Sequence, residues 1–160
     1  HQCTSRNRLR KKTMFRDSFR SRRCIVPADG FYEWQSTASW RQPYFVQLGD
    51  HAAFGFAGLW NQSSNQTGEL VHTFTILTTR ANTLLIGLHR RMPVILDEKN
   101  RKAWLTTGMD VVPPNRFNNP YPSLRMTMTP VSKVVNNSRN ESIDCLQAIT
   151  VKEGLRLFAL

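Results

Sequence analysis

The feature that most constrains the fold is a series of short, strand-like segments separated by turn-forming residues. The segments contain β-branched or aromatic residues, and Gly, Pro, Asn or Asp residues lie in most of the stretches between them. The segments cover residues 31–34, 43–49, 52–60, 71–79 and 92–96. Within 52–60, small residues alternate with large ones, a pattern typical of close backbone approach in a packed sheet or barrel. The chain is therefore expected to be built mainly from strands.

Few helices are expected beside these strands. Asp97 is a suitable N-cap for a helix over 98–106, with Ala103, Trp104 and Leu105 on or near its buried side. Shorter helices are predicted near 14–21 and over 82–88. The fold class is α+β, with a mainly antiparallel, barrel-like sheet and a few peripheral helices.

The 160 residues are enough for one hydrophobic core. No internal repeat, linker or second zone of composition divides them, so residues 1–160 are predicted to form a single domain, and we expect a monomer.

A strong excess of positive charge indicates the class of partner. The net charge is +11, from 22 Lys and Arg against 11 Asp and Glu, and this favours a polyanion, most simply nucleic acid. Arginines are dense in residues 1–23, where Asp17 is the single acid; Arg16 and Arg23 are among them. A solvated basic arm is the alternative interpretation, but this density favours contacts with phosphates.

Several classes of protein are disfavoured. The longest apolar runs are too short to span a bilayer, and no apolar segment follows the basic N-terminus as in a signal peptide. The three cysteines lack metal-ligand spacing, and no Gly-rich phosphate loop is present. We therefore predict no metal, no cofactor and no membrane partner, with a cytoplasmic location that is nucleoid-associated if the protein is bacterial.

The first candidate catalytic residue is Glu33, which lies between two aromatic residues in the segment 24–34. Strand alternation places Phe31 and Glu33 on one face, and Tyr32 and Trp34 on the other. A carboxylate flanked by rings is partly desolvated, which suits it to hold and pass a proton. A surface glutamate on an edge strand is the alternative. Trp34 is the tryptophan that we assign to a base-stacking surface.

A second segment, residues 88–96, supplies a partner for Glu33. His89 precedes two arginines, whose charge favours a neutral imidazole that accepts a proton. Arg91 is placed to hold a phosphate. Thr78, at the end of a predicted strand, offers a hydroxyl to the same cleft, although ordinary strand-end chemistry is the alternative.

Six motifs, in this order along the chain, resemble those of the SOS-response-associated peptidase (SRAP) family, whose members shield abasic sites in single-stranded DNA. The resemblance extends from Met14 to Leu146. The motifs are Arg23–Trp34, Phe56–Trp60, Thr75–Thr79, His89–Leu96, Trp104–Leu105 and Pro130–Asn140.

The resemblance implies a compact α+β domain around a barrel-like core, and a function in DNA repair. In the family, an N-terminal cysteine condenses with the sugar aldehyde of an abasic site and forms a covalent protein–DNA thiazolidine. The motif glutamate, which matches Glu33, is implied to move protons, and the motif histidine, which matches His89, to assist elimination or reversal. The motif arginine matches Arg91 and is implied to grip DNA phosphate. The same site is credited with autoproteolytic release of the leading Met.

The N-terminus departs from the family pattern Met-Cys-Gly-Arg. This sequence begins His1-Gln2-Cys3, and an amide nitrogen on Cys3 cannot close a thiazolidine. We therefore expect the domain to be N-terminally truncated, without its nucleophile. Two hypotheses remain: an abasic-site processing domain, covalent in its intact form, or a non-catalytic single-stranded nucleic-acid-binding module on a degenerate scaffold. A conventional protease is disfavoured, because no cysteine is paired by a motif with His89.

Overall fold

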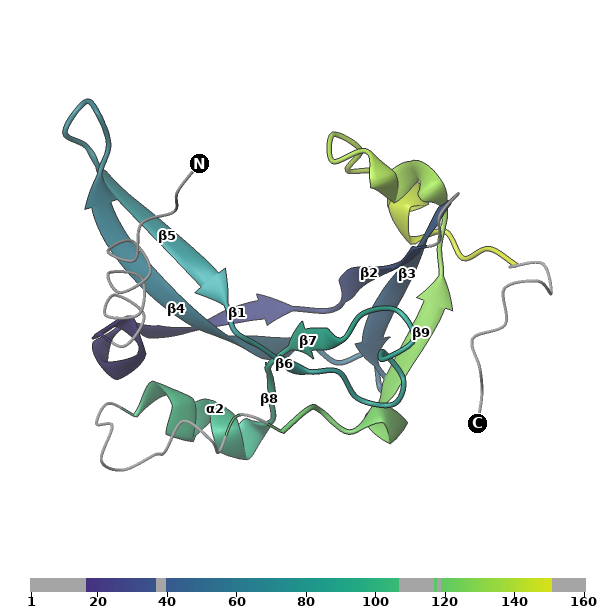
Figure 1. The fold of residues 1–160 in the computed structure, drawn as a ribbon, viewed down its shortest axis with the longest axis horizontal. Helices are drawn as coiled ribbons and strands as arrows, with labels where there is room; N and C mark the ends of the chain where they lie inside the picture. The colour runs from purple at the N-terminus through teal and green to yellow at the C-terminus, as the bar shows by residue number, and fades with distance from the viewer. Residues whose placement is uncertain (1–16, 37–39, 107–116, 118, 151–160) are drawn as a thin grey trace, which may run out of the picture. The chain divides into compact units, whose positions relative to one another are not determined.

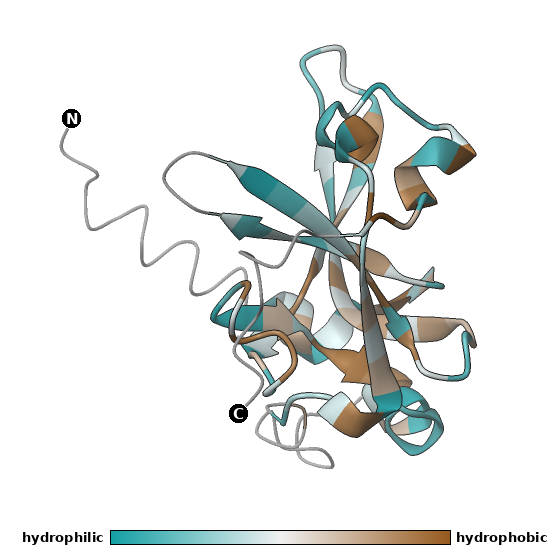
Figure 2. Cartoon of the chain, turned by 90° about the vertical axis from the view of Figure 1, so that its right-hand side faces the viewer, coloured by the Kyte–Doolittle hydropathy of each residue, from teal (hydrophilic) through white to brown (hydrophobic). Residues whose placement is uncertain are grey.

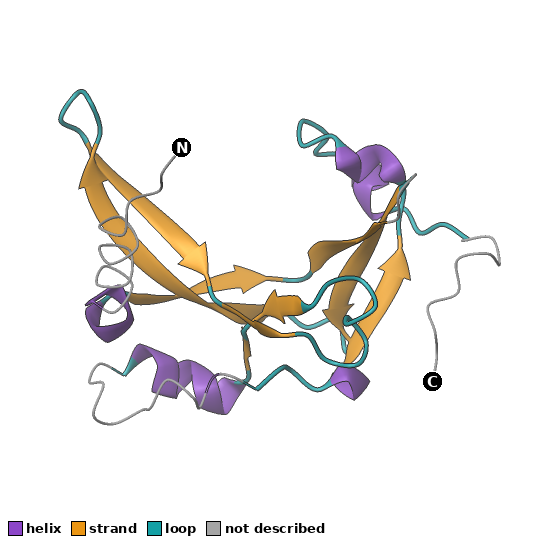
Figure 3. Ribbon diagram, viewed as in Figure 1, coloured by secondary structure: helices purple, strands orange, loops and turns teal. Residues whose placement is uncertain are grey.

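The structure is a computed structural model that describes residues 17–36, 40–106, 117 and 119–150. Strands predominate in this part of the chain, and its helices are short (Figures 1 and 3). Two compact units form, each from three separate stretches. Unit 1 comprises His1–Pro27, Gly55–Leu77 and Pro93–Asn119, and unit 2 comprises Ala28–Phe54, Thr78–Met92 and Pro120–Leu160. Because the two units are interleaved in sequence, neither could be recognised as a contiguous segment.

The sheet of unit 1 is organised around its longest described strand, β4 (Phe54–Ser64). Strands β1 (Arg23–Ala28), β5 (Leu70–Ile76) and β8 (Ile95–Leu96) all pair with β4. The pairings with β5 and β8 are antiparallel. Glycines allow the close approach expected for 52–60: a Cβ at Gly58 would lie 2.8 Å from Cys24 Sγ, and one at Gly55 would overlap the Ile25 side chain.

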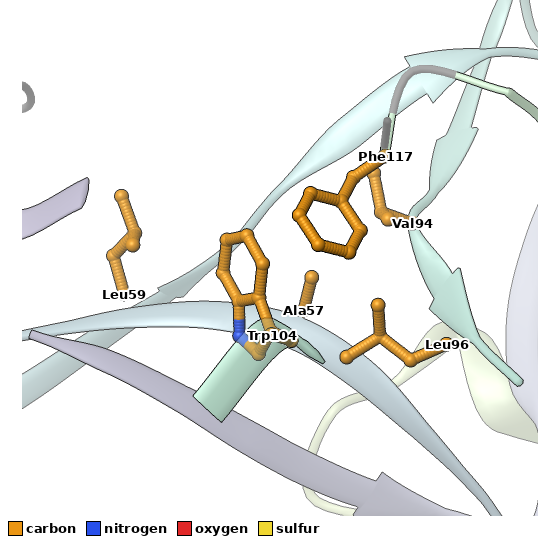
Figure 4. Packing of buried hydrophobic residues seen from close by; sticks show 6 residues of the cluster. All are labelled: Ala57, Leu59, Val94, Leu96, Trp104 and Phe117. Carbon is orange, nitrogen blue, oxygen red and sulfur yellow. The ribbon is translucent and has the colours of Figure 1, made fainter. Parts of the chain in front are cut away.

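The core of unit 1 is apolar and centres on Trp104, from helix α2 (Glu98–Leu105) (Figure 4). Asp97 caps this helix by accepting a hydrogen bond from the Asn100 N–H, as predicted. Trp104 is fully buried, and its indole N–H donates to Cys24 O over 2.8 Å. The rings of Phe19 and Phe117 meet it edge to face. One tryptophan thus joins the helix to β1 through both apolar and polar contacts.

Unit 2 contains an antiparallel sheet of different composition. Its order is β2 (Phe31–Ser36), β3 (Arg41–Leu48) and β9 (Met126–Pro130). The register places Glu33 opposite Tyr44, and Tyr44 opposite Pro130. Tyr44, Val46 and Leu48 are buried on one face of this sheet.

The remainder of unit 2 consists of short elements. Strand β6 (Thr78–Arg80) pairs with β7 (Arg91–Pro93), and a turn occupies the residues between them. Three single-turn 3-10 helices lie near the C-terminal end of the described chain: η2 (Ser123–Arg125), η3 (Lys133–Asn136) and η4 (Ile143–Leu146). The ribbon coloured by hydropathy shows hydrophobic and hydrophilic residues mixed along the strands (Figure 2). None of the described helices is long and apolar enough to cross a membrane.

The α+β class with mainly antiparallel strands is confirmed. The description "barrel-like" was loose, because the described strands form open sheets. The single domain over 1–160 stays a prediction.

Several boundaries differ from those expected. The segment 82–88 forms hydrogen-bonded turns instead of a helix, and the expected strand 71–79 is interrupted at Leu77. The strand expected over 52–60 is observed over Phe54–Ser64. Of the helix expected near 14–21, residues 17–21 are described and are helical. Leu105 is 51% exposed, so its expected place on the buried side was wrong.

Candidate functional site

Glu33 lies on the same sheet face as the buried residues of unit 2. Directly paired residues of neighbouring strands share a face, and the register pairs Glu33 with Tyr44. Tyr44 is 4% exposed, and its hydroxyl donates to Gln35 Oε1 on the same face. Glu33 itself is half-buried. The alternation predicted from sequence is therefore correct, and it sets the carboxylate beside a buried phenol.

Trp34 is on the opposite face of β2, together with Tyr32. Its indole N–H donates to Asn136 Oδ1 over 2.7 Å, and the Arg41 guanidinium lies 5.6 Å from the ring centroid. Both contacts come from within unit 2 and fix the orientation of the indole. The base-stacking role of Trp34 stays a prediction, and it would act on a different sheet face from the Glu33 carboxylate.

Thr78, His89 and Arg91 are brought together by the pairing of β6 with β7. Arg91 Nε donates to Thr78 Oγ1 over 2.8 Å, and its Nη2 donates to Thr78 O. His89 Nδ1 lies 2.9 Å from Arg91 O. All three residues are exposed, so these side chains meet at the surface of unit 2.

The contacts of His89 indicate which ring nitrogen is available for chemistry. The contact of Nδ1 with Arg91 O requires a proton on Nδ1, whereas the longer contact with the Arg91 N–H, at 3.3 Å, requires a lone pair there. The shorter contact favours the Nδ1–H tautomer, which is assigned here from hydrogen bonding. In that tautomer Nε2 carries the lone pair and can accept a proton.

Asn82 ties the segment that carries His89 to the sheet that carries Glu33. It is 8% exposed; its Oδ1 accepts from the N–H groups of Leu84 and Leu85, and its Nδ2 donates to Tyr121 O and Met126 Sδ. Met126 pairs with Leu48 on the Glu33 face, four residues along β9 from Pro130. Met126 therefore lies roughly 13 Å along β9 from Pro130, which is in register with Tyr44 and Glu33. The histidine segment is therefore fastened to one end of the face from which Glu33 projects.

Of the two basic residues assigned to DNA from residues 1–23, only Arg23 is described, and its contact with DNA stays a prediction. Arg23 belongs to unit 1, where its guanidinium lies 4.6 Å from the Phe19 centroid and 5.0 Å from the Trp104 centroid. It donates to Phe19 O and Trp104 O, and burial lowers its pKa. Arg23 is therefore occupied by the core of its own unit. Arg16 and Cys3 lie outside the described residues.

Burial also changes the proton affinity of groups near Glu33. The pKa of Tyr44 is raised because the phenol is buried. The pKa of Tyr32 is raised mainly by burial, with smaller contributions from the charges of Cys145 and Asp29. Both phenols therefore stay protonated at neutral pH and can act as hydrogen-bond donors. The part of the chain that is described holds no group of three His, Cys, Asp or Glu residues suited to a metal ion.

Sequence reasoning missed several residues that position this site. The link of Asn82 to Tyr121 and Met126 had no local signal. The same holds for Asn136 as the partner of Trp34, 102 residues away in sequence. Such partners are set by tertiary packing, which no spacing rule encodes.

Comparison with known proteins identifies the family of this chain. The sequence matches the SOS response associated peptidase (SRAP) family over residues 3–138. Abasic site processing protein YoqW of Bacillus subtilis (strain 168) is 36% identical over 144 residues, covering 88% of this chain and 63% of that protein. Abasic site processing protein HMCES of Xenopus tropicalis is 33% identical over 175 residues, covering 94% of this chain and 51% of that protein.

A crystal structure of a protein from Bacteroides thetaiotaomicron has the same fold, with a TM-score of 0.74 and 26% identity, covering 84% of this chain and 60% of that one. The chain spans less than two thirds of the length of these relatives. The family match extends over most of the sequence and includes the segments that carry Glu33, His89 and Arg91. The chain belongs to the SOS response associated peptidase (SRAP) family.

Proposed function

We propose that this chain binds single-stranded DNA at abasic sites and carries the proton-transfer part of an abasic-site processing centre. The observation that carries the proposal is the attachment of the His89 segment, through Asn82, to the sheet face from which Glu33 projects. The names of the relatives YoqW and HMCES support DNA abasic sites as the substrate.

Each residue has a distinct role in this proposal. Glu33 moves protons as the aldehyde of the opened sugar condenses with an amine and loses water. His89 Nε2 takes the proton released during elimination, or returns it during reversal. Arg91, oriented by Thr78, pairs with a DNA phosphate through the part of its guanidinium that faces solvent.

The covalent step needs a nucleophile that the described residues do not provide. The family resemblance assigns it to an N-terminal cysteine, which attacks the aldehyde carbon through its amine and then closes the ring through its thiol, with loss of one water. Autoproteolytic exposure of that cysteine would use the same two residues, Glu33 and His89. A non-catalytic single-stranded DNA-binding module is the second hypothesis, favoured by the basic charge alone.

The test incubates the chain with single-stranded DNA that contains one abasic site, and follows the DNA on a denaturing gel. A band that survives denaturation, or strand incision at the site, supports the processing function. Reversible, salt-sensitive binding with neither product supports the binding module instead.

Variants then assign the residues. Glu33→Gln and His89→Ala should slow the reaction while the circular dichroism spectrum stays unchanged. Glu141→Gln, an exposed glutamate of the same unit, is the matched control and should react at the parent rate. Unaltered rates in both site variants would remove these residues from the mechanism.

Arg91 is tested by the salt dependence of binding. Each phosphate contact contributes about one to the slope of log affinity against log salt concentration, and somewhat less on single strands. Arg91→Glu should therefore lower that slope by about one. A parent-like slope would show that Arg91 does not contact phosphate.

A further inference from the structure

The β4–β5 hairpin carries aromatic side chains on one face and belongs to unit 1, whereas Glu33 and His89 belong to unit 2. The register pairs Trp60 with Phe74 and Gln62 with His72, so these four residues share a face. Leu59, one residue from Trp60, is on the other face and belongs to the apolar core. On β4, one face therefore packs in the core and the other is turned away from it, whereas β5 is exposed on both faces from Leu70 to Thr75.

The face turned away from the core is aromatic and exposed. Phe74 is 63% exposed and His72 is exposed, whereas Trp60 is half-buried. The Trp60 and His72 rings lie 6.0 Å apart at a 46° tilt. Leu70, opposite Ser64 on the same face, is 64% exposed. Exposed rings and apolar side chains grouped on one strand face make this face a candidate interaction surface.

A cation is fixed beside these rings. Arg22 O accepts a hydrogen bond from the Trp60 N–H over 2.9 Å, and the Arg22 guanidinium donates to Asn61 Oδ1. Its Cζ lies 6.0 Å from the Trp60 centroid, at the limit of cation–π range. The described strands β4 and β5 contain no acidic residue. Aromatic faces with a held cation and without carboxylates suit an anionic ligand that also offers flat rings.

We propose that this face, formed by Trp60, His72 and Phe74 with Arg22 beside it, is a second nucleic-acid surface on which bases of single-stranded DNA stack. Base–aromatic stacking tolerates any sequence, because every base has a π-face, and Arg22 pairs with a neighbouring phosphate. A purely apolar protein partner fits less well, because the face combines rings with a cation in a chain of net charge +11. The inference rests on the proposed function only in taking DNA as the partner.

The test separates stacking from charge. Binding is measured by fluorescence anisotropy for two undamaged probes: an oligothymidylate, and a chain of the same length with base-free tetrahydrofuran spacers throughout. Phe74→Ala should weaken binding of the oligothymidylate by about fivefold or more, which is the lower limit for loss of one stacked base, and leave binding of the spacer chain unchanged. Phe74→Trp should retain the parent preference for the oligothymidylate.

Val71→Ala is the matched control. Val71 is on the same strand but on the opposite face, and it is 38% exposed. The Val71→Ala variant should bind both probes with the affinity of the parent. Because neither probe presents an aldehyde, this measurement does not depend on the abasic-site chemistry, so failure of that chemistry and failure of this surface give different results.

Three outcomes would overturn the proposal. The first is an unchanged affinity of Phe74→Ala for the oligothymidylate. The second is an equal loss for both probes, which would indicate charge alone. The third is a parent that sediments as a dimer and a Phe74→Ala variant that sediments as a monomer with unaltered DNA affinity, which would assign the face to a second copy of the chain.

Discussion

The two units use their sheets in different ways. In unit 1, Ala57 and Leu59 of β4 pack with Trp104 and Phe117 into an apolar core. In unit 2, the face of the β2–β3–β9 sheet that holds Tyr44 and Val46 also carries Glu33, Gln35 and Gln42. Gln42 is 4% exposed and donates from Nε2 to Pro43 O and Val131 O. This face of unit 2 therefore contains polar side chains as well as apolar ones, and the buried amide of Gln42 has hydrogen-bond partners.

This difference suggests that unit 1 serves mainly as scaffold, whereas unit 2 carries the residues proposed for chemistry. An apolar core is stabilised by burial, which does not depend on direction, so it needs few specific partners except where a charge such as that of Arg23 enters it. A face with polar groups depends on defined hydrogen bonds, which orient side chains at the expense of stability. The residues proposed for proton transfer and phosphate contact, Glu33, His89 and Arg91, all come from unit 2. Substitutions at three positions test this comparison between the units, and they are given in order of decreasing expected effect on stability.

Trp104→Ala should have the largest effect on stability. It removes a fully buried indole, its edge-to-face contacts and the hydrogen bond to Cys24 O. The expected loss is about 3–5 kcal/mol in the free energy of unfolding, a large share of the usual total. Urea denaturation measures it. Leu105→Ala, on the same helix but 51% exposed, should change stability by less than about 0.5 kcal/mol. Equal losses in both variants would show that Trp104 does not organise the core.

Asn82→Ala should have an intermediate effect, and one centred on unit 2. It leaves the N–H groups of Leu84 and Leu85 and the carbonyl of Tyr121 without this partner, at a cost of about 1–3 kcal/mol. Hydrogen exchange should quicken at Leu84 and Leu85, while the amides of α2 keep their protection.

Asn82→Asp keeps the hydrogen-bond acceptor and loses the donor. Its stability and its exchange rates at Leu84 and Leu85 should therefore lie between those of the parent and those of Asn82→Ala. Faster exchange throughout α2 in either variant would contradict a role confined to unit 2.

Tyr44→Phe should have the smallest effect at neutral pH and a distinct effect in alkali. Burial raises the Tyr44 pKa, so the folded state holds this proton more tightly than the unfolded state. The resulting stability is complete below the unfolded value of about 10, and it is lost as pH rises through the higher folded value. Tyr44→Phe removes the hydrogen bond to Gln35, so the free energy of unfolding should drop by about 1 kcal/mol at neutral pH. Above pH 10, the free energy of unfolding of the variant should fall less steeply than that of the parent.

Thermal unfolding between pH 8 and 11 measures this slope. Some slope remains in the variant, because burial also raises the pKa of Tyr32. A variant that is as alkali-sensitive as the parent would show that Tyr44 does not titrate with unfolding.

Local chemistry explains what could be predicted. Asp97 was identified as a cap because a capping carboxylate and its N–H donor lie three residues apart. The opposite faces of Glu33 and Trp34 followed from the period of a strand. The segment 82–88 begins as a helix would, with Asn82 accepting from the Leu84 and Leu85 N–H groups, but Leu88 N–H then donates three residues back, to Leu85 O, and the segment forms turns. Arg23 was assigned to phosphate from charge density, yet its contacts with Phe19 and Trp104 depend on residues brought together by folding.

The sequence by itself determined the α+β class, the faces of the strands, the cap of α2 and the family, because each depends on residues near in the chain or on motifs in a fixed order. Tertiary structure alone decided that Thr78, His89 and Arg91 meet, that Asn82 joins their segment to β9, and that aromatic residues gather on one face of the β4–β5 hairpin. The physical reason is that such contacts depend on strand register and on side-chain packing between distant segments, and these are fixed only when the whole chain has folded.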